Sequence, residues 1–155
     1  FGLKRELEHY VALYDVEVLR RLRGPLQPNP GVRELIALLQ RRGLKLAVAS
    51  GSQRSWIDAT LASLAIDGAL RTVVSGDSVE HGKPAPDIFL RTAKLLAVAP
   101  ERCLVLEDAP NGVLAAKRAG MRVVAVRTNF TRHLDLGEPD YVVDSLEEFP
   151  LAALD

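Results

Sequence analysis

Three short segments combine turn-forming residues with groups that bind phosphate or metal ions: Ser50-Gly51-Ser52, Gly82-Lys83-Pro84 and Glu107-Asp108. Each segment follows a short apolar run of the kind that forms a buried strand in a parallel sheet. In an open parallel sheet, ligands bind just beyond the carboxyl ends of the strands. We therefore expect a hydroxyl, an ammonium and a pair of carboxylates to meet at one edge of one sheet.

The segment from Ser50 to Arg54 is suited to binding an oxyanion. A hydroxyl and a glycine stand at the entrance to a helical pattern, where free backbone N–H groups and the helix dipole favour negative charge. Ser50 and Gly51 are therefore candidate phosphate ligands, and Arg54 is a candidate substrate contact. The alternative is that Ser50 or Ser52 serves only as the N-cap of that helix.

Lys83 lies between a glycine and a proline, so it does not belong to a helix. The neighbouring prolines restrict the backbone and allow the ammonium to be aimed at a phosphate as a point charge. The alternative is a solvated lysine in a turn that leads into a helix, which is the usual environment of this residue type.

Glu107 and Asp108 are adjacent carboxylates at a predicted strand end, and they repel each other unless a cation or a base lies nearby. Mg²⁺ suits such a pair, because it prefers oxygen ligands and usually takes one or two carboxylates together with a substrate phosphate. The alternative is that Asp108 caps the next helix while Glu107 faces solvent.

The rest of the chain supplies the elements that must position these groups. Helical patterns are predicted over residues 3–22, 32–39, 52–64, 86–96 and 113–119, and strands over 44–49, 70–74, 103–106, 122–126 and 141–143. A proline-rich stretch, residues 24–31, separates the first helix from the remainder and is the best linker candidate. Alternation of strand and helix predicts an α/β fold with a doubly wound parallel sheet.

Composition excludes several classes of function. The 155 residues hold 20 Lys plus Arg against 20 Asp plus Glu, so nothing indicates a nucleic-acid partner or an anionic membrane surface. The apolar runs are far shorter than a membrane span. The single cysteine, Cys103, has no partner for an internal disulfide and is interpreted as a core residue, which fits a cytoplasmic protein. The sequence carries no signal for an oligomeric state. Arg54 and Arg127 lie near the predicted edge of the sheet, where each could equally be a solvated surface residue or a substrate contact.

Three segments together resemble motifs of a known family. Ala49-Ser50-Gly51-Ser52, Gly82-Lys83-Pro84-Ala85-Pro86-Asp87 and Leu106-Glu107-Asp108-Ala109-Pro110-Asn111-Gly112 are similar to motifs two, three and four of the haloacid dehalogenase-like (HAD) superfamily. The similarity is to the branch of β-phosphoglucomutase, phosphoglycolate phosphatase and pseudouridine-5′-phosphatase, and it covers about residues 28–150. It implies a Rossmann-like core and a Mg²⁺-dependent reaction on a small phosphorylated metabolite.

The resemblance also implies a role for each matching residue. Ser50 would bind the phosphoryl oxygens, Lys83 would steady the nucleophile and the phosphate, and Glu107 with Asp108 would hold Mg²⁺. Residues 1–24 would be the last part of a helical cap, and residues 25–155 would be the α/β core.

The first motif of the family, a strand that ends in Asp-x-Asp-Gly-Thr, has no match in this sequence. Asp15-Val16-Glu17 is the nearest match, but it lies in a helical pattern without Gly-Thr after it and is rejected. We therefore expect the core to lack its first strand and two other strands to lack a partner. The catalytic nucleophile would be an upstream Asp, so this chain alone should not turn over substrate.

The hypothesis is a phosphatase that hydrolyses a sugar or nucleotide phosphate through an aspartyl-phosphate. A phosphomutase of the β-phosphoglucomutase type would use every residue named above. A phosphate-binding fragment that lacks the nucleophile by nature is the alternative from a different class.

Overall fold

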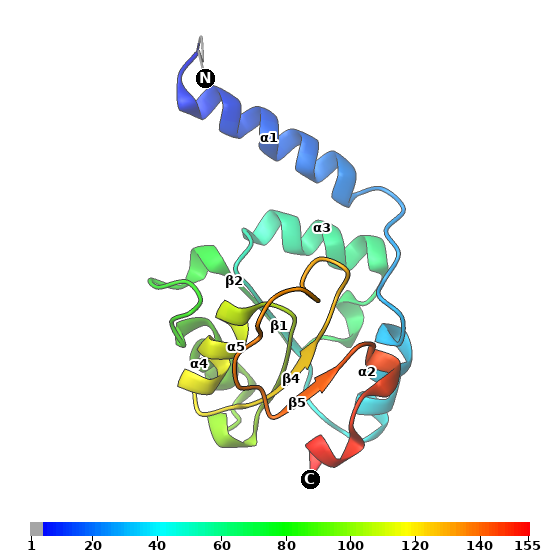
Figure 1. Cartoon of the computed structure of the whole chain (residues 1–155). Coiled ribbons are helices and arrows are strands. Elements are labelled where there is room, and N and C mark those ends of the chain that lie inside the picture. The colour runs from blue at the N-terminus through cyan, green and yellow to red at the C-terminus, as the bar shows by residue number, and fades with distance from the viewer. Residues whose placement is uncertain (1–4) are drawn as a thin grey trace.

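The computed structural model describes residues 5–155, and it is an α/β structure in which every described strand pairing is parallel. The strands are β1 (Ala47–Ser50), β2 (Thr72–Ser75), β3 (Leu104–Glu107), β4 (Arg122–Val126) and β5 (Tyr141–Val143). The α-helices are α1 (Leu7–Leu22), α2 (Val32–Arg41), α3 (Arg54–Leu64), α4 (Asp87–Leu96) and α5 (Pro110–Arg118). Short 3-10 helices span Asp67–Ala69, Gly76–Ser78, Pro100–Arg102, Leu146–Glu148 and Leu151–Leu154. The order of elements confirms the predicted fold class (Figure 1).

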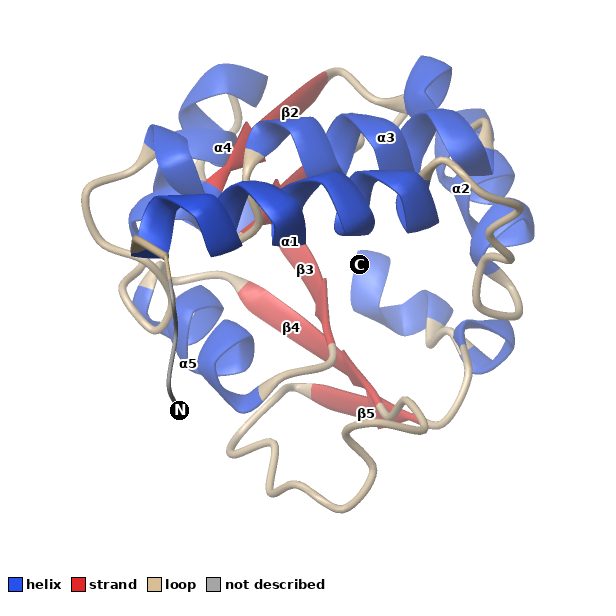
Figure 2. Cartoon of the chain, turned by 90° about the horizontal axis from the view of Figure 1, so that it is seen from above, coloured by secondary structure: helices blue, strands red, loops and turns tan. Residues whose placement is uncertain are grey.

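The strands form two separate sheets rather than one. β1 pairs with β2, and β4 lies between β3 and β5 in the second sheet. Within residues 5–155, β1 and β3 each have a single strand partner, which leaves both with an open edge. β2 and β5 likewise have a single partner each, so the expectation that a strand is missing between β1 and β3 stays a prediction. Figure 2 shows the strands from above, beneath α1.

One core joins the two sheets. α4 packs on β1 and β2, while α5 packs on β3 and β4, so the two helices cover one face. Their buried residues form a single cluster with Val74 of β2, Val105 of β3 and Val123 of β4. Val124 and Val143 point to the opposite face and pack with Ala153 near the C-terminus. Because β4 is covered on both faces, it has the near-continuous apolar sequence expected of a parallel sheet.

Most predicted boundaries differ from the structure by one to three residues, and for two of them the local reason is clear. The first strand begins at Ala47 rather than residue 44, because the Leu44 N–H is still bonded to the Leu39 carbonyl at the end of α2. α5 begins at Pro110 rather than residue 113, with the proline in the first turn, where its missing N–H costs nothing. The predicted ranges of β4 and β5 are confirmed.

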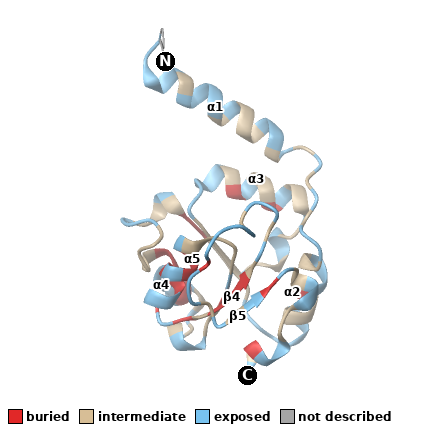
Figure 3. Cartoon of the chain, viewed as in Figure 1, coloured by how far each residue is buried: buried red, intermediate tan, exposed pale blue. Residues whose placement is uncertain are grey.

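α1 extends from the rest of the molecule (Figure 1). Among the described helices and strands, only α3 packs closely against it. None of its residues is buried, and apolar side chains such as Leu7, Val11 and Val16 are exposed (Figure 3). The predicted helix starts earlier, at Leu3, which lies outside the described residues. No helix among residues 5–155 combines the length and the apolar character needed to cross a bilayer.

Asp140, directly before β5, connects that strand to β4 and α5 by hydrogen bonds. Its carboxylate accepts hydrogen bonds from the Val123 backbone N–H at 2.7 Å and from the Lys117 ammonium at 2.8 Å. The hydrogen bond from Lys117 is the larger cause of a pKa for Asp140 below the ordinary value, and the Val123 N–H adds to it.

We expect Asp140→Asn to lower the free energy of unfolding by about 1 kcal/mol at neutral pH, because an amide binds Lys117 and the N–H less strongly. A carboxyl with a depressed folded-state pKa stabilises the protein above its ordinary pKa and loses that effect as the pH falls through the folded-state value. The difference in the free energy of unfolding between wild type and Asp140→Asn should therefore disappear on acidification. Denaturant unfolding at about pH 7 and about pH 3 measures it, and Glu138→Gln, an exposed neighbour, is the control. An equal difference at both pH values would contradict this prediction.

Candidate active site

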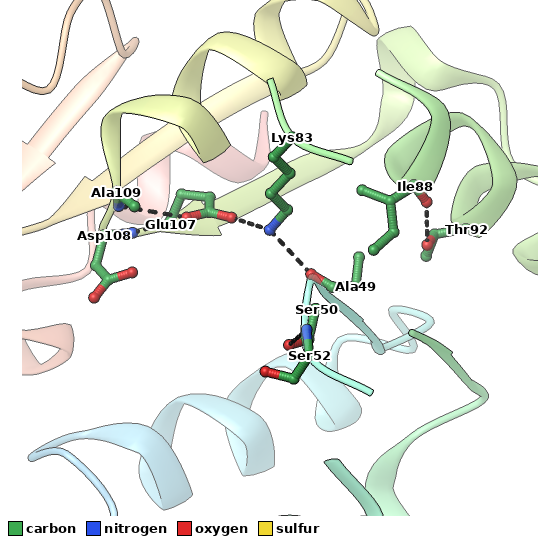
Figure 4. A network of polar contacts seen from close by, with 9 residues as sticks. All are labelled: Ala49, Ser50, Ser52, Lys83, Ile88, Thr92, Glu107, Asp108 and Ala109. Atoms are coloured by element: carbon green, nitrogen blue, oxygen red, sulfur yellow. Dashed lines mark hydrogen bonds and ion pairs between the residues drawn. The ribbon is translucent and has the colours of Figure 1, made fainter. Parts of the chain in front are cut away.

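Three of the predicted segments meet at the carboxyl ends of the strands. Ser50 is the last residue of β1 and Glu107 is the last residue of β3. Lys83 precedes α4 and extends its side chain into the space between these two strand ends (Figure 4). The structure thus brings together hydroxyl, ammonium and carboxylate groups that are far apart in the sequence.

Lys83 connects the two sheets. Its ammonium donates a hydrogen bond to the Ala49 carbonyl of β1 at 3.1 Å and another to Oε1 of Glu107 in β3. Its side chain is 18% exposed, and the ammonium lies 4.7 Å from the centre of the Phe89 ring. The alternative of a solvated surface lysine is therefore wrong. The ammonium still has one N–H available for a further acceptor, since it carries three.

Glu107 is held on both of its oxygens. Oε1 accepts from Lys83, while Oε2 accepts from the backbone N–H groups of Asp108 at 3.2 Å and Ala109 at 3.4 Å. These N–H groups stand at the start of α5, where the helix dipole favours a negative charge. The Glu107 side chain is 10% exposed, so the alternative that it faces solvent is also wrong.

Gly112, in the first turns of α5, makes this position of Glu107 possible. A Cβ atom at residue 112 would overlap the carboxylate carbon and both oxygens of Glu107. Glycine is therefore needed at position 112 because the Glu107 side chain lies so close. It is not needed for its backbone conformation, since its φ is not in the left-handed region.

Asp108 has a different environment from its neighbour. Its carboxylate points away from Glu107 (Figure 4), and no residue of the described range 5–155 donates a hydrogen bond to it. The N-cap of α5 is Ala109, which has no side-chain cap, so the alternative role of Asp108 as a helix cap is wrong. The Asp108 oxygens are therefore available to a ligand.

Ser50, Gly51 and Ser52 form a tight loop before α3. The Ser50 hydroxyl accepts a hydrogen bond from the Ser52 N–H at 3.2 Å, which leaves its own proton free to be donated. Gly76 packs against this loop: it donates to the Ser52 carbonyl at 3.0 Å, and a Cβ at residue 76 would overlap the Gly51 carbonyl. The loop backbone is therefore fixed from the neighbouring β2 end.

Neither serine caps α3, contrary to the alternative given above. The N-cap position is Gln53, without a side-chain cap. Asp77 takes that role instead, because its carboxylate accepts from the Arg54 N–H at 3.3 Å. Hydrogen bonds from Ser75 and from this N–H lower the pKa of Asp77.

Arg54 is engaged on the side of α3. Its guanidinium bonds to Asp58 at 2.8 Å and to the Val73 carbonyl at 3.4 Å. The structure does not bring it to Lys83 or Glu107, and a substrate contact by Arg54 stays a prediction.

A pocket of about 360 Å³ lies beside Ser50 and Ser52, between α1, β1 and α3. Its other walls are mainly apolar: Val18, Leu22, Val48, Trp56, Ile57, Thr60 and Leu61. Asp15 of α1 fixes this arrangement by accepting hydrogen bonds from Gln53 and Trp56. Asp15 lies in α1, which confirms the predicted helix at this residue.

The carboxylates present are compatible with Mg²⁺. The described part of the chain has no group of three or more His, Cys, Asp or Glu placed to hold a metal ion. Asp108 offers free carboxylate oxygens, whereas both oxygens of Glu107 already accept hydrogen bonds. One free carboxylate matches a cation that takes one or two carboxylates and fills its other positions with water and substrate phosphate. A structural zinc or calcium site would need more protein ligands than this pair.

Several positions at this site have no signal of their own in the sequence. The Ala49 carbonyl, Asp77 and Gly76 act through contacts between segments that are far apart in the chain. Gly112 acts on Glu107, which is five residues away in the same motif. Phe89 is a core residue that is 5% exposed, and its ring also faces the Lys83 ammonium. Cys103 packs against the core as predicted, and burial raises the pKa of its thiol.

Comparison with known proteins identifies the family. The model of the haloacid dehalogenase-like hydrolases matches residues 2–120. The chain belongs to this haloacid dehalogenase-like family. Its relatives include the fructose-1-phosphate phosphatase YqaB of Escherichia coli, 39% identical over 120 residues, which are 77% of this chain and 63% of YqaB. Another is the phosphorylated carbohydrates phosphatase of Thermotoga maritima, 35% identical over 119 residues, or 77% of this chain and 55% of that protein.

The fold agrees with the haloacid dehalogenase-like assignment. The crystal structure of an Asp-to-Asn mutant of CbbY from Rhodobacter sphaeroides, in complex with xylulose-1,5-bisphosphate, superposes with a TM-score of 0.86 at 31% identity. The alignment covers 94% of this chain and 68% of the CbbY chain. The chain thus spans a little over half the length of the two sequence relatives named above.

Proposed function

We propose that the full-length protein is a Mg²⁺-dependent phosphatase that hydrolyses the phosphate monoester of a small sugar. The observation that carries the proposal is the position of the Lys83 ammonium, which bridges Glu107 and the Ala49 carbonyl beside Asp108 and the Ser50 loop. Such a grouping provides hydrogen-bond donors and a counter-charge for a phosphoryl group, and catalysis of phosphoryl transfer consists mainly of positioning and electrostatic stabilisation.

Each residue has a distinct task in this proposal. The Ser50 hydroxyl donates its free proton to a phosphoryl oxygen, and backbone N–H groups at the start of α3 offer further donors. The third N–H of the Lys83 ammonium reaches the same phosphoryl group. Asp108, with Glu107 beside it, would hold Mg²⁺, which when bound supplies positive charge to the phosphoryl oxygens. Glu107 also fixes Lys83, since it is the carboxylate that the ammonium contacts.

The nucleophile in the proposed reaction is an Asp outside these 155 residues. Its carboxylate attacks phosphorus in line, the bond from phosphorus to the sugar oxygen breaks, and that oxygen takes a proton from solvent and leaves as a hydroxyl. Water then hydrolyses the aspartyl-phosphate, which releases inorganic phosphate and restores the Asp carboxylate. Supporting this, β1 and β3 have open edges at the site, and a strand between them would supply the backbone partners that these edges lack.

The names of the relatives support a phosphorylated sugar as substrate. YqaB is named for fructose-1-phosphate, the Thermotoga protein for phosphorylated carbohydrates, and CbbY was crystallised with a pentulose bisphosphate.

A panel of sugar phosphates and nucleotides, assayed for released inorganic phosphate with the full-length protein, tests this function. We expect phosphate release from sugar phosphates in the presence of Mg²⁺ and loss of that activity when the metal is chelated. Conversion of one sugar phosphate into its isomer without free phosphate would instead identify a phosphomutase. Hydrolysis that is insensitive to chelation would contradict the proposal.

A further inference from the structure

A second pocket, of about 490 Å³, is lined by Arg127, Arg132, Leu134 and Asp144 and is separate from the groups described above. Arg127 directly follows β4, and Asp144 directly follows β5. Both residues therefore lie at the carboxyl edge of the sheet, which is the edge that carries Glu107 and Asp108. Figure 1 shows the loop after β4, in orange, rising on the side of the sheet where α1 lies.

The register of the strands places this pocket close to the phosphoryl site. Glu107 of β3 is the partner of Ala125 in β4, so Arg127 stands two residues beyond the neighbour of Glu107. Adjacent strands are about 5 Å apart. A five- or six-carbon sugar with an anionic group at each end can therefore place one group at the phosphoryl site and the other at Arg127. The length of the arginine side chain adds to this reach.

Hydrogen bonds within the loop hold the backbone of both arginines in place. The Arg127 N–H is bonded to the Val143 carbonyl at 2.9 Å, which continues the pairing of β4 with β5 beyond the last strand residue. The Arg132 N–H is bonded to the Thr128 carbonyl at 2.9 Å, and the Thr128 and Thr131 hydroxyls are 2.9 Å apart. Buried Leu136 anchors the far end of the loop in the core. The loop backbone is therefore ordered before any ligand arrives, which reduces the entropy cost of binding.

The charges of the pocket favour an anion. Its lining has two guanidinium groups against one carboxylate, Asp144. Arg127 and Asp144 form a loose ion pair at 3.7 Å, and the Asp144 side chain is 69% exposed, so it can move away at little cost. The Arg132 side chain has no hydrogen-bond or ion-pair partner within residues 5–155. Guanidinium groups are suited to the paired oxygens of a phosphate or carboxylate.

We propose that Arg127 and Arg132 bind a second anionic group, a phosphate or a carboxylate, on the substrate whose phosphate ester lies at Ser50 and Lys83. This inference rests on the proposed function and narrows the substrate to sugars with an anionic group at each end. Asp144 opposes binding by competing for Arg127.

The binding of inorganic phosphate, followed by NMR shifts of the backbone amides, tests the pocket without requiring turnover. We expect phosphate to shift amides of residues 127–134, with an affinity that falls roughly tenfold or more in Arg127→Gln/Arg132→Gln. Asp144→Asn should bind more tightly than wild type. Arg41→Gln is the matched control, because Arg41 is an exposed arginine at the end of α2, which leads to the amino end of β1. Shifts confined to the Ser50 loop, or equal affinity in all variants, would overturn the inference.

Kinetics of the full-length protein on a sugar bisphosphate and on the corresponding monophosphate then test the role in the substrate. The double arginine variant should lose roughly tenfold or more in kcat/KM for the bisphosphate and retain its value for the monophosphate. Equal losses on both substrates, or none on either, would overturn the inference while leaving the proposed function intact. If neither substrate is hydrolysed by wild type, the proposed function fails, and with it the role of the pocket in a substrate.

Discussion

Replacement of Lys83 by Met is expected to reduce phosphate release by the full-length protein by at least about 100-fold. The ammonium is the only cation among the described residues that contacts both the Ala49 carbonyl and Glu107, so nothing else in this part of the protein can take its place. Methionine keeps the apolar length of the side chain, and its contact with Phe89, but supplies no donor and no charge. The measurement is kcat/KM for a sugar phosphate at saturating Mg²⁺.

The same substitution should also destabilise the fold. It leaves the Glu107 carboxylate, which is 10% exposed, without its charged partner, and removal of one member of a buried ion pair costs about 3 kcal/mol or more. Lys83→Met/Glu107→Gln removes both charges and should recover most of that stability but none of the activity. Lys94→Met changes an exposed lysine of α4 and is the control. Wild-type activity in Lys83→Met would refute the proposed role of the ammonium.

Gly112→Ala should lower the free energy of unfolding by about 2 kcal/mol and also impair catalysis. Alanine normally favours a helix over glycine by about 1 kcal/mol, so the helix propensity acts in the opposite direction. The clash prevails because the new Cβ would overlap the Glu107 carboxylate, which is fixed by Lys83 and by the start of α5. Displacing that carboxylate also releases Lys83 from its position. Thermal or denaturant unfolding and kcat/KM together measure the effect.

Gly68→Ala provides the matched control, because a Cβ at that position meets no atom within 4 Å and its φ is not positive. A second variant, Gly112→Ala/Glu107→Asp, shortens the acidic side chain and should recover stability by relieving the overlap. If Gly112→Ala proved as stable as Gly68→Ala and fully active, the close approach of Glu107 to α5 would have no functional importance.

The sequence was sufficient to predict the α/β class because the signals are local. Short apolar runs bounded by turn formers predict buried parallel strands, and β4 and β5 occur where they were expected. The sequence also predicted that Ser50 and Asp108 lie at one edge of the sheet, since a polar residue at the end of a strand of a parallel sheet has a known place at the ligand-binding edge. Their roles in binding stay predictions. Strand and helix ends were less predictable, because hydrogen bonds such as that from Leu44 to Leu39 alter them.

The local alternatives could be decided only by tertiary contacts. Sequence patterns could not distinguish a solvated Lys83 from a buried one, or a capping Asp108 from a free one, because each alternative satisfies the same turn. The structure decides these environments: Lys83 contacts Ala49 and Glu107 across the two sheets, and Asp77 caps α3. The types of chemical groups were thus determined by the sequence alone. Their convergence depends on three-dimensional packing, since strands that are distant in the chain end at one edge.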